Sequence, residues 1–457
     1  MPAYGMGAAM GWLGNLAEAG RIRLAHYGAA LSAGSALAGP FLGGIAGGAA
    51  GKAKLGATLG SPAGQRQLAA LQRAFLPNVL KPGRGIAAYD NNGTAIVTRH
   101  ADVIEVLERE ADFAVVYEPR MRRLTDGENF FLGMQDGPAY TRDVTNMRAA
   151  VRRGDLAGMV VPLAAQRAAE IVAAAPGRLD LPVDLARRIP LHLLDRYFGT
   201  PGPSEAETAE WMTVLFWYLF ADLDADPAIE ARAMAAAASL RVYLDGAIAA
   251  RKAAGAGGDD ILGRCLALQA AGQPGMDDLG IRNNLIGLLI GFVPTIAKAT
   301  TQALAQLLQR PAALAVAQGA ARAGDDALLG ICVFEAMRFD PGNPLIYRRA
   351  VRDTEIARGT LRALKIPKDT MVLAANLSAM FDPLAWPAPE EFRIDRPWAQ
   401  YILWGWGMHT CFGEHINRAI IPQILKPLLA KPGLRAIGPI DKGGTPFPVH
   451  YPVTWDA

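Results

Sequence analysis

The sequence predicts one large, mainly helical domain with a small β part. Long Ala- and Leu-rich segments with helical periodicity fill most of the chain, whereas β-prone segments are short. Hydrophobic residues make up 51% of the 457 residues and charged residues 19%, which supplies enough apolar material for a large core. No internal repeat and no convincing linker follows residue 60, so a single domain is favoured over several.

Charge and cysteine content limit the function. A formal net charge of +3 is small for this length, and no basic run with interleaved aromatics occurs, so nucleic acid is a poor candidate partner. Cys265, Cys332 and Cys411 are far apart and form no CxxC pair. This argues against a disulfide framework or a cysteine-built zinc site and favours a reducing compartment. We therefore expect a cytoplasmic protein.

Residues 1–60 are set apart as a Gly- and Ala-rich arm, and residues 61–457 as the main domain. Between Leu24 and Gly51 no residue carries a formal charge, a length sufficient to cross a bilayer. The run lacks the Leu, Ile and Val density that makes insertion favourable, and it does not fit a cleaved signal peptide. We expect a flexible or loosely packed arm. The alternatives are a membrane-surface or partner contact, which would make the protein peripherally membrane-associated, and a true membrane span.

The elements of the main domain follow in order along the chain. The segment AAYDNNGTAIVTR predicts a hairpin with its turn at Asn92-Gly93, a pair suited to positive φ. The segment HADVIEVLERE predicts an amphipathic helix. Further helices are expected at about 156–175, 205–220, 227–252, 277–310 and 325–338, extended segments between 348 and 372, and a last helix at 413–429.

The third cysteine lies in the loop WGWGMHTCFGEHINR, residues 404–418. A metal-binding cysteine acts as a thiolate, which needs a positive field and nearby donors. A loop that leads into a helix N-terminus supplies backbone N–H groups and the positive end of the helix dipole. Gly405, Gly407 and Gly413 let the backbone pass close to a flat, bulky group, and His409 suits an anionic one. The alternative is a buried, inert cysteine in a glycine-rich turn.

Several motifs, in order and at family-like spacing, resemble those of the cytochrome P450 family. The cysteine loop resembles the family's haem-binding loop, F-G-x-G-x-H/R-x-C-x-G, with Trp404 in place of the usual Phe. EAMR (335–338) matches the E-x-x-R of the family's K helix, and FRIDRP supplies Arg396 as the third member of a Glu-Arg-Arg cluster. KIPKDTMV is similar to the strand turn I-P-K-G-T-x-V, with Asp369 for Gly, and TRHADVIEVL to the helix after the first hairpin.

This resemblance implies a cytochrome P450 fold with haem b (iron protoporphyrin IX) bound through Cys411. The cysteine would be the axial thiolate, a ligand that favours O–O cleavage. His409 would donate to one haem propionate, and Arg348 or the neighbouring Arg349 would serve the second. A structural charge network on the cysteine side of the haem is expected from Glu335, Arg338 and Arg396.

The first departure from the family lies in the helix expected at 277–310. Its counterpart, the I helix, carries A/G-G-x-D/E-T, in which the acid and the alcohol relay protons for dioxygen activation. Here the segment is GFVPT, so Pro294 takes the acid position and Thr295 the alcohol position. Proline removes an N–H and clashes with the carbonyl of Ile290, so we expect a kink and a carbonyl able to hold a water. Either Thr295 and this water still relay protons, or proton delivery is impaired and the substrate is already at the peroxide level.

The second departure lies in MQDGPAYTRDVTNMR, where the family reads D-P-P-E-H-T-R-x-x-R. Tyr140 stands for the His and Val144 for the Arg that bind a propionate. Arg142 or Arg148 is expected to substitute, because helical spacing brings either near the face of Tyr140.

The substrate pocket is expected to be apolar. Its expected lining residues are Phe292, Val293, Leu345 and Ile346. The loop EPRMRRL (118–124) carries three arginines that could anchor a fatty-acid carboxylate; the alternative is a solvated charged loop.

The function expected is therefore that of a haem-thiolate oxidoreductase of a hydrophobic, lipid-like small molecule, with peroxide or an organic (fatty-acid) hydroperoxide as oxygen source or substrate. One alternative is a dioxygen-dependent monooxygenase. Its electrons would come from a separate ferredoxin or reductase, because the chain has no nicotinamide or flavin fingerprint. The other alternative is a haem sensor or carrier without turnover.

Overall fold

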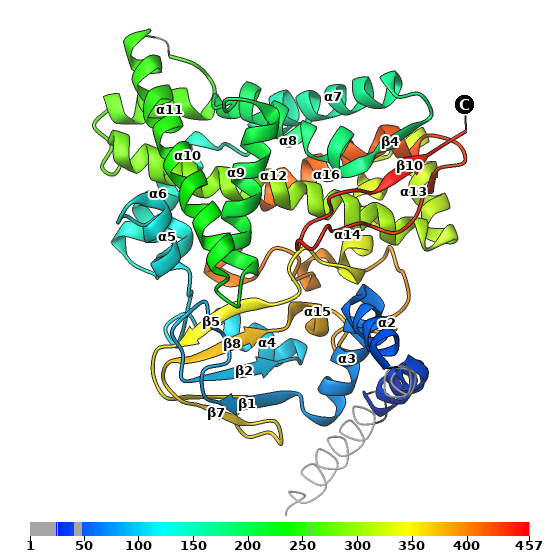
Figure 1. Ribbon diagram of the computed structural model, residues 1–457. Coiled ribbons are helices and arrows are strands. Elements are labelled where there is room, and N and C mark those ends of the chain that lie inside the picture. Colours follow the sequence, from blue (N-terminus) through cyan, green and yellow to red (C-terminus); the bar gives the residue numbers. More distant parts are fainter. Residues whose placement is uncertain (1–23, 25, 41–47, 256, 457) are drawn as a thin grey trace, which may run out of the picture. The chain divides into compact units, whose positions relative to one another are not determined.

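The computed structural model describes residues 24, 26–40, 48–255 and 257–456 (Figure 1). The chain divides into two compact units. The first unit comprises residues 1–83, 92–113 and 338–406, and the second comprises residues 84–91, 114–337 and 407–457. Two of the boundaries fall within secondary structure, one in the short strand β3 (Phe113–Ala114) and one near the end of helix α14 (Asp326–Phe339).

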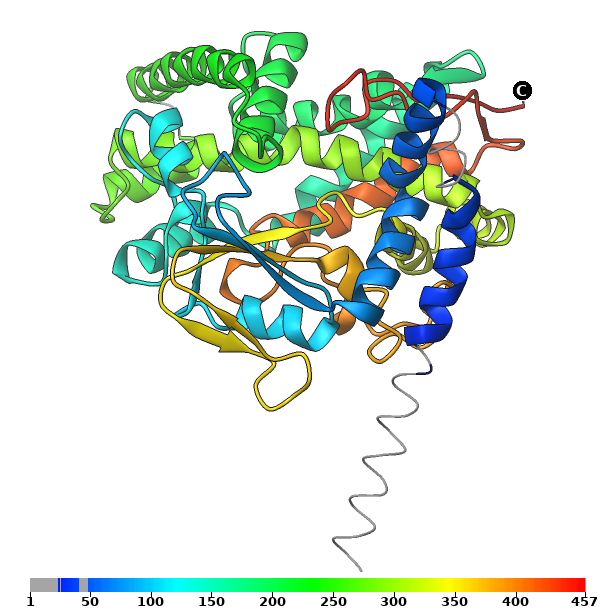
Figure 2. The same ribbon diagram turned by 60° about the horizontal axis from the view of Figure 1, so that its bottom comes forward.

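The first unit contains the larger β-sheet. Its helices are α2 (Gly48–Gly60), α3 (Pro62–Phe75), α4 (His100–Glu108), α15 (Asn376–Ala379) and the 3₁₀ turn η6 (Trp398–Gln400). Its strands are β1 (Asn78–Pro82), β2 (Gly93–Val97), β5 (Ile346–Ala350), β6 (Thr354–Ile356), β7 (Leu364–Ile366) and β8 (Thr370–Ala374). Figure 2 shows β1, β2, β8 and β5 side by side in this order. β2 and β8 are parallel, whereas β1 and β5 run antiparallel to their neighbours.

A buried apolar cluster joins this sheet to α4. Val97 of β2 and Val372 of β8 are fully buried together with Val103 and Val106, which lie one turn apart on α4. The amphipathic helix predicted from HADVIEVLERE is therefore confirmed, and its apolar side covers the sheet. β8 is buried along its whole length, as befits a central strand.

The hairpin predicted around Asn92-Gly93 is wrong in its first strand. β2 begins at Gly93 as expected, but its antiparallel partner is β1 and not residues 87–90. The Asn91 side chain donates hydrogen bonds to two carbonyls of the preceding loop, at 2.7 Å each. These side-chain bonds hold the loop in turns, so its backbone is not available to a strand.

The turn before β8 departs from the family's motif in one residue and adopts the backbone that the motif requires. Asp369 stands where the resembling motif has Gly, and its φ is +63°, in the left-handed region. Aspartate is among the residues other than glycine that tolerate this region best. Its N–H donates to the carbonyl of Ala350 at 2.8 Å, which ties the turn to the end of β5.

The second unit is almost entirely helical. Its α-helices are α5 (Glu118–Thr125), α6 (Pro138–Ala150), α7 (Val161–Ala174), α8 (Arg188–Leu193), α9 (Glu205–Phe216), α10 (Pro227–Ala253), α11 (Ile261–Ala270), α12 (Asp278–Leu308), α13 (Pro311–Ala323), most of α14, and α16 (Glu414–Leu429). Shorter elements are the 3₁₀ turns η1 (Phe131–Gly133) and η7 (Gly407–His409), the π-helical turns η2 (Leu156–Val160), η3 (Leu181–Ala186), η4 (Leu194–Phe198) and η5 (Trp217–Ala221), and the strands β4 (Arg178–Asp180), β9 (Arg435–Ala436) and β10 (Pro452–Thr454). The long helices and the last helix predicted from the sequence are confirmed.

Helix α12 is the central element of this unit. It packs against α9, α10 and α16, which Figures 1 and 2 show around it. By length and composition alone, residues 156–174, α10 and α12 are apolar enough to cross a membrane. In α12, however, 67% of the most apolar stretch is buried inside the protein, so this apolar surface serves the core.

The N-terminal arm is helical where it is described. Residues 26–40 form a helix that buries Ala30, Ala33 and Leu37 on one side, and α2 follows. The expectation of a loosely packed arm does not describe residues 26–40. The rest of the uncharged run, residues 25 and 41–47, and the first 23 residues lie outside the described residues.

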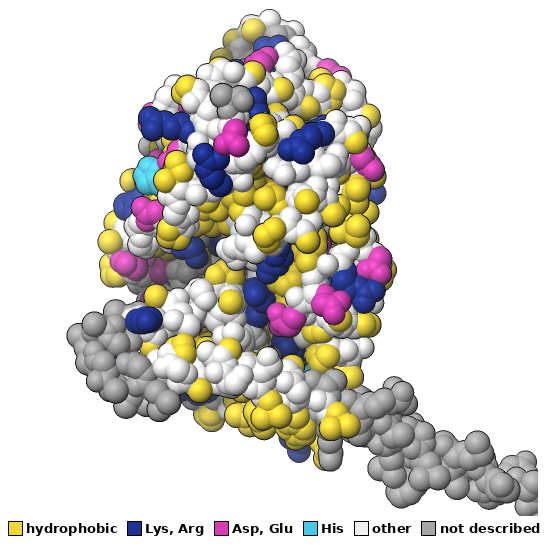
Figure 3. Space-filling model, turned by 90° about the vertical axis from the view of Figure 1, so that its right-hand side faces the viewer, with side chains coloured by type: hydrophobic (Ala, Val, Ile, Leu, Met, Phe, Trp, Pro, Cys, Tyr) yellow, Lys and Arg dark blue, Asp and Glu magenta, His cyan; other side chains and the backbone are white. Residues whose placement is uncertain are grey.

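The surface charges of the second unit include local ion pairs. Lys426 lies 2.7 Å from Asp326, and Arg435 lies 2.7 Å from Asp456. On the face that Figure 3 draws, Lys and Arg side chains are interspersed with Asp and Glu side chains among hydrophobic ones. Exposed pairs of this kind contribute at most about 1 kcal/mol each to stability.

Candidate haem site

Cys411 lies between η7 and the first turn of α16, in the second unit. The residue is partly exposed, and the backbone N–H groups of Gly413 and Glu414 donate to its sulfur. Burial raises the pKa of Cys411 to about 11, because desolvation outweighs these N–H groups and the nearby Arg148. The thiol without a metal is therefore neutral at pH 7, and a metal ion has to displace its proton to bind.

The glycines before the cysteine have backbone conformations that explain their identity. Gly405 and Gly407 have φ values of +84° and +70°. These values lie in the left-handed region, which glycine adopts without a steric penalty. The spacing of the glycines in the loop thus reflects two sharp changes of chain direction before Cys411.

Helix α6 brings Tyr140 to the cysteine loop. The Tyr140 hydroxyl donates to the carbonyl of Met408 at 2.9 Å. Its ring stands edge-on to the ring of His409, with 5.4 Å between the ring centroids. The two residues predicted to serve the haem propionates from α6 and from the loop are therefore neighbours.

The two arginines proposed to replace the family's propionate-binding Arg point to different places. Arg148 donates through Nη1 to the carbonyl of Phe412 at 2.9 Å, and its guanidinium lies 3.9 Å from the centre of that ring. Arg148 is half-buried, and this desolvation lowers the pKa of its guanidinium. Arg142 instead donates to Asp143 at 2.7 Å. Arg148, and not Arg142, contacts the cysteine loop.

Helix α12 presents a partly exposed strip to open space. Gly291 and Thr295 are partly exposed, four positions apart, and a Cβ added at Gly291 would meet nothing within 4 Å. We call these two residues the open face of α12. The Thr295 hydroxyl donates to the Gly291 carbonyl one turn earlier, which leaves its oxygen able to accept a hydrogen bond.

Of the predicted pocket residues on α12, Phe292 lies about a quarter turn from the open face, and Val293 lies on the opposite side of the helix. Phe292 packs against Phe198, with 4.9 Å between ring centroids, and Val293 is fully buried. Leu345 and Ile346, at the start of β5 in the first unit, are partly exposed. The spacing of Gly291 and Thr295 by four residues was the signal in the sequence that these two share one face.

Pro294 lies inside α12, which runs without interruption from Asp278 to Leu308. Because proline has no N–H, it leaves the carbonyl of Ile290 without its helical donor. The helix contains one acidic residue, Asp278, in its first turn. No carboxylate of this helix therefore lies near Thr295, and the kink expected at Pro294 stays a prediction.

The remaining predicted site residues belong to the first unit or to its boundary. Arg338 and Arg396 both donate to the carbonyl of Glu391, each at 3.2 Å, and both guanidinium groups lie near the ring of Trp386. Glu335 is fully buried on the same helix as Arg338. The two arginines of the network thus converge within one unit, and the role of Glu335 in it stays a prediction.

The two candidate arginines, Arg348 and Arg349, lie on opposite faces of the strand β5. Arg348 is 2% exposed, whereas the Arg349 side chain is 43% exposed and lies 3.9 Å from Asp369. Successive residues of a strand point to opposite faces, which accounts for the difference. Trp404, in place of the family's Phe, packs against Trp398 with 5.4 Å between ring centroids.

The residues of the second unit fit a haem held by one thiolate. Among the residues that the structure describes, no group of three or more His, Cys, Asp or Glu side chains is placed to hold a metal ion. A haem iron needs only one such ligand from this side, because the porphyrin supplies four. Cys411, the two N–H groups that donate to its sulfur and the open space beside Gly291 meet the demands of that group.

Several known proteins are similar in sequence to this chain. Residues 212–431, which include Thr295 and Cys411, match the family model described as cytochrome P450. A 94-residue segment is 37% identical to the linoleate diol synthase of Gaeumannomyces graminis and covers 20% of this chain. A 268-residue segment is 29% identical to the C-19 steroid 1alpha-hydroxylase of Sorangium cellulosum and covers 57% of this chain. These segments span 8% and 63% of the lengths of the two relatives.

A solved structure confirms the predicted fold. The crystal structure of CYP105P1 in complex with filipin I superimposes with a TM-score of 0.69 at 26% identity, and the match covers 85% of this chain and 95% of that one. The family model, the relatives and this structure show that the chain belongs to the cytochrome P450 family, whose members are oxidoreductases that bind haem b through a cysteine thiolate.

Proposed function

We propose that this protein oxidises a hydrophobic small molecule in the cytoplasm and takes its oxygen from peroxide or from an organic hydroperoxide. Cys411 would hold the haem iron, with Tyr140, His409 and Arg148 holding the loop and the propionates. The haem would supply O–O cleavage and oxygen transfer when bound. The protein's own residues would orient the substrate, exclude water and control protons at the open face of α12.

The observation that carries this proposal is the pair Pro294–Thr295. Use of dioxygen requires two electrons and two protons for each oxygen atom inserted, with the second oxygen released as water. Hydrogen peroxide already carries both electrons and both protons, so an oxygen atom passes to the substrate and water leaves. A helix with no acid near Thr295 suits the second reaction, because less proton delivery is demanded of it.

The substrate class is supported by the apolar environment and by one relative. Phe292 is an apolar residue about a quarter turn from the open face, and apolar surroundings favour a substrate held by shape. The linoleate diol synthase acts, by its name, on a fatty acid. A lipid-like substrate is therefore part of the proposal.

A dioxygen-dependent monooxygenase supplied by a ferredoxin or reductase is the second candidate. The position of Thr295 on the open face favours it, since its oxygen can accept a hydrogen bond from a water held by the Ile290 carbonyl. The steroid relative is a hydroxylase by name. A haem sensor or carrier would be left only if no oxidant gave product.

The test is product formation by the haem-loaded protein from a fatty-acid hydroperoxide, without reductant and with oxygen excluded. Rapid consumption with the hydroperoxide's oxygens retained in the product supports the proposal. Absence of consumption, together with turnover on dioxygen and a ferredoxin system, refutes it.

Two variants sharpen this test. Thr295→Ala should leave hydroperoxide turnover nearly unchanged, whereas a monooxygenase should lose coupling between electron use and product. Pro294→Asp restores an acid, so dioxygen-dependent activity should rise while hydroperoxide activity does not. A rise in both would show that Pro294 does not select the oxidant.

A further inference from the structure

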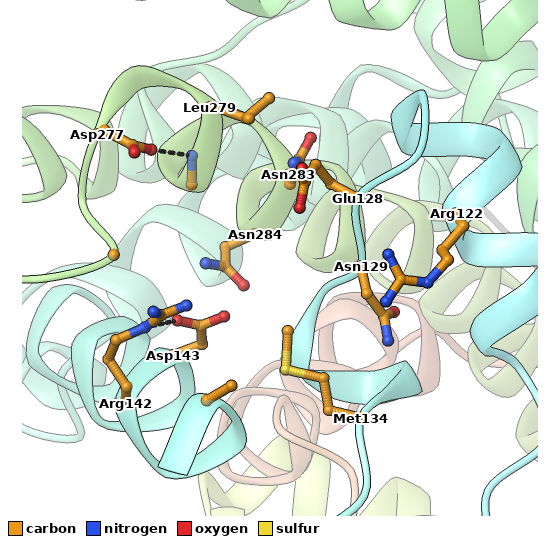
Figure 4. A pocket seen from close by; sticks show the side chains of 13 residues that line it. Arg122, Glu128, Asn129, Met134, Arg142, Asp143, Asp277, Leu279, Asn283 and Asn284 are labelled. Atoms are coloured by element: carbon orange, nitrogen blue, oxygen red, sulfur yellow. Dashed lines mark hydrogen bonds and ion pairs between the residues drawn. The ribbon is translucent and has the colours of Figure 1, made fainter. Parts of the chain in front are cut away.

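A polar pocket lies within the second unit at the N-terminal end of α12, between α5 and α6 (Figure 4). Its volume is about 430 Å³. Figure 4 shows Asp143, Asn284 and Met134 around its interior, with Arg122 and Glu128 on one side. None of these residues belongs to the haem site described above.

The arginines of this pocket are already occupied by the protein's own acceptors. Arg122 donates to Glu118 at 2.9 Å and to the carbonyl of Gly127 at 2.7 Å. Arg142 donates to Asp143, and it lies so close to Gly275 that a Cβ there would fall 2.4 Å from its Nε. Both guanidinium groups are therefore held, which disfavours their use as an anchor for a carboxylate.

The other arginines of the EPRMRRL segment are also paired. Arg120 is 5% exposed and lies 3.1 Å from Asp222, and Arg123 lies 2.7 Å from Glu230. The helix N-terminus at the pocket is capped in the same way, because Asp277 accepts the N–H of Gly280 at 2.7 Å. The arginines and the helix N-terminus around the pocket are thus already paired with acceptors of the protein itself.

Two of the remaining polar side chains offer acceptors to the pocket. Asp143 is 4% exposed and uses one carboxylate oxygen for Arg142, while Figure 4 shows its other oxygen directed to the interior of the pocket. Asn284 is 2% exposed, and its Oδ1 is buried without a hydrogen-bond partner. A buried acceptor without a donor costs about 1–3 kcal/mol, which a donating ligand would recover.

We propose that this pocket binds the hydrogen-bond-donating head group, an ammonium or a hydroxyl, of an otherwise apolar substrate. Asp143 and Asn284 accept its hydrogen bonds, and Met134 contacts the first carbons. Asn284 and Thr295 share α12 and lie about 16 Å apart by helical rise, which is the length that a substrate would need to span from the pocket to the open face. The inference rests on the proposed function only in that the ligand is called a substrate.

Binding of three probes tests this inference without turnover. The probes are decylammonium, 1,2-decanediol and decanoate, measured by titration calorimetry on ferric haem-loaded protein whose iron carries cyanide, so that an amine cannot ligate it. Decylammonium or the diol should bind at least about tenfold more tightly than decanoate. Which of the two binds better identifies the head group. Tightest binding by decanoate would overturn the inference.

Variants locate the binding. Asn284→Leu, of similar size, and Asp143→Asn should each weaken the donating probe about tenfold, and Asp143→Asn should not weaken decanoate. Glu170→Gln removes one negative charge from an exposed position on α7 and should change nothing. Unchanged affinities in both pocket variants would overturn the inference. Failure of peroxide turnover would bear on the proposed function alone, because the titration requires no reaction.

Discussion

Arg148 and Tyr140 are two side chains through which α6 holds the cysteine loop. Arg148 is the one next to the cysteine. It binds the Phe412 carbonyl and covers the Phe412 ring, directly after Cys411. Arg148→Gln should therefore lower haem retention about 10- to 100-fold, the usual effect of removing a partner that supports a metal ligand. The measurement is haem loss to an acceptor protein, together with the thiolate-type spectrum of the ferrous carbon monoxide complex.

Arg142→Gln is the matched control, because it makes the same change on the same helix. Its guanidinium pairs with Asp143 and does not contact the loop, so haem retention should stay at the parent value. Equal losses in both variants would mean that α6 as a whole, and not the Arg148 contact, holds the site.

The choice between these two arginines could not be made from the sequence. Helical spacing places Arg142 and Arg148 within reach of Tyr140, and only the packing of α6 against the cysteine loop separates them. The cysteine loop itself was predictable, because the glycines with positive φ and the helix N-terminus after Cys411 are local properties of the chain. Which side chains contact the loop depends instead on residues that are distant in sequence.

At the scale of elements, Pro294 makes α12 less stable than its sequence would otherwise allow. Proline inside a helix costs about 3 kcal/mol relative to alanine, because a hydrogen bond is lost and the ring clashes with the preceding turn. Pro294→Ala should raise the free energy of unfolding by about 1–3 kcal/mol, as seen in chemical denaturation. Because alanine adds no acid near Thr295, hydroperoxide turnover should stay unchanged.

The control is Pro422→Ala, which makes the same repair inside α16. It should stabilise the protein without a change in hydroperoxide turnover. A fall in hydroperoxide turnover in Pro294→Ala, with none in Pro422→Ala, would mean that the proline ring itself, and not the absence of an acid, supports the reaction.

The elements differ in how far local patterns predict them. The long helices follow from apolar periodicity, and the structure confirms them at nearly the expected bounds. The predicted hairpin was wrong in its first strand, because Asn92-Gly93 marks only the start of β2. Its partner β1 lies before a loop that Asn91 holds by its side chain, and no periodicity reports such bonds.

At the scale of the whole molecule, stability depends in part on a polar cluster buried within the first unit. In the first unit, His26 of the N-terminal helix lies 3.3 Å from Asp382, and its Nε2 also contacts Arg99. His26 and Asp382 are both nearly inaccessible to solvent. Because an arginine can only donate, His26 accepts this hydrogen bond and is neutral in the folded protein. The arm is thus joined to the first unit through a buried polar cluster.

This cluster predicts loss of stability in acid. Burial, followed by the charge of Arg99, lowers the pKa of His26 to about 4, whereas the unfolded chain has a histidine pKa near 6.5. Between these values the unfolded state binds more protons than the folded state, so stability is complete above about pH 6.5 and falls as the pH drops towards 4. The loss is at most about 3 kcal/mol, by 1.36 kcal/mol per pKa unit. Denaturation midpoints should therefore decrease over this range, and His26→Gln, which keeps an acceptor but does not titrate, should flatten the decrease. Equal decreases in the parent and the variant would show that folding does not shift the pKa of His26 and that other groups cause the loss of stability.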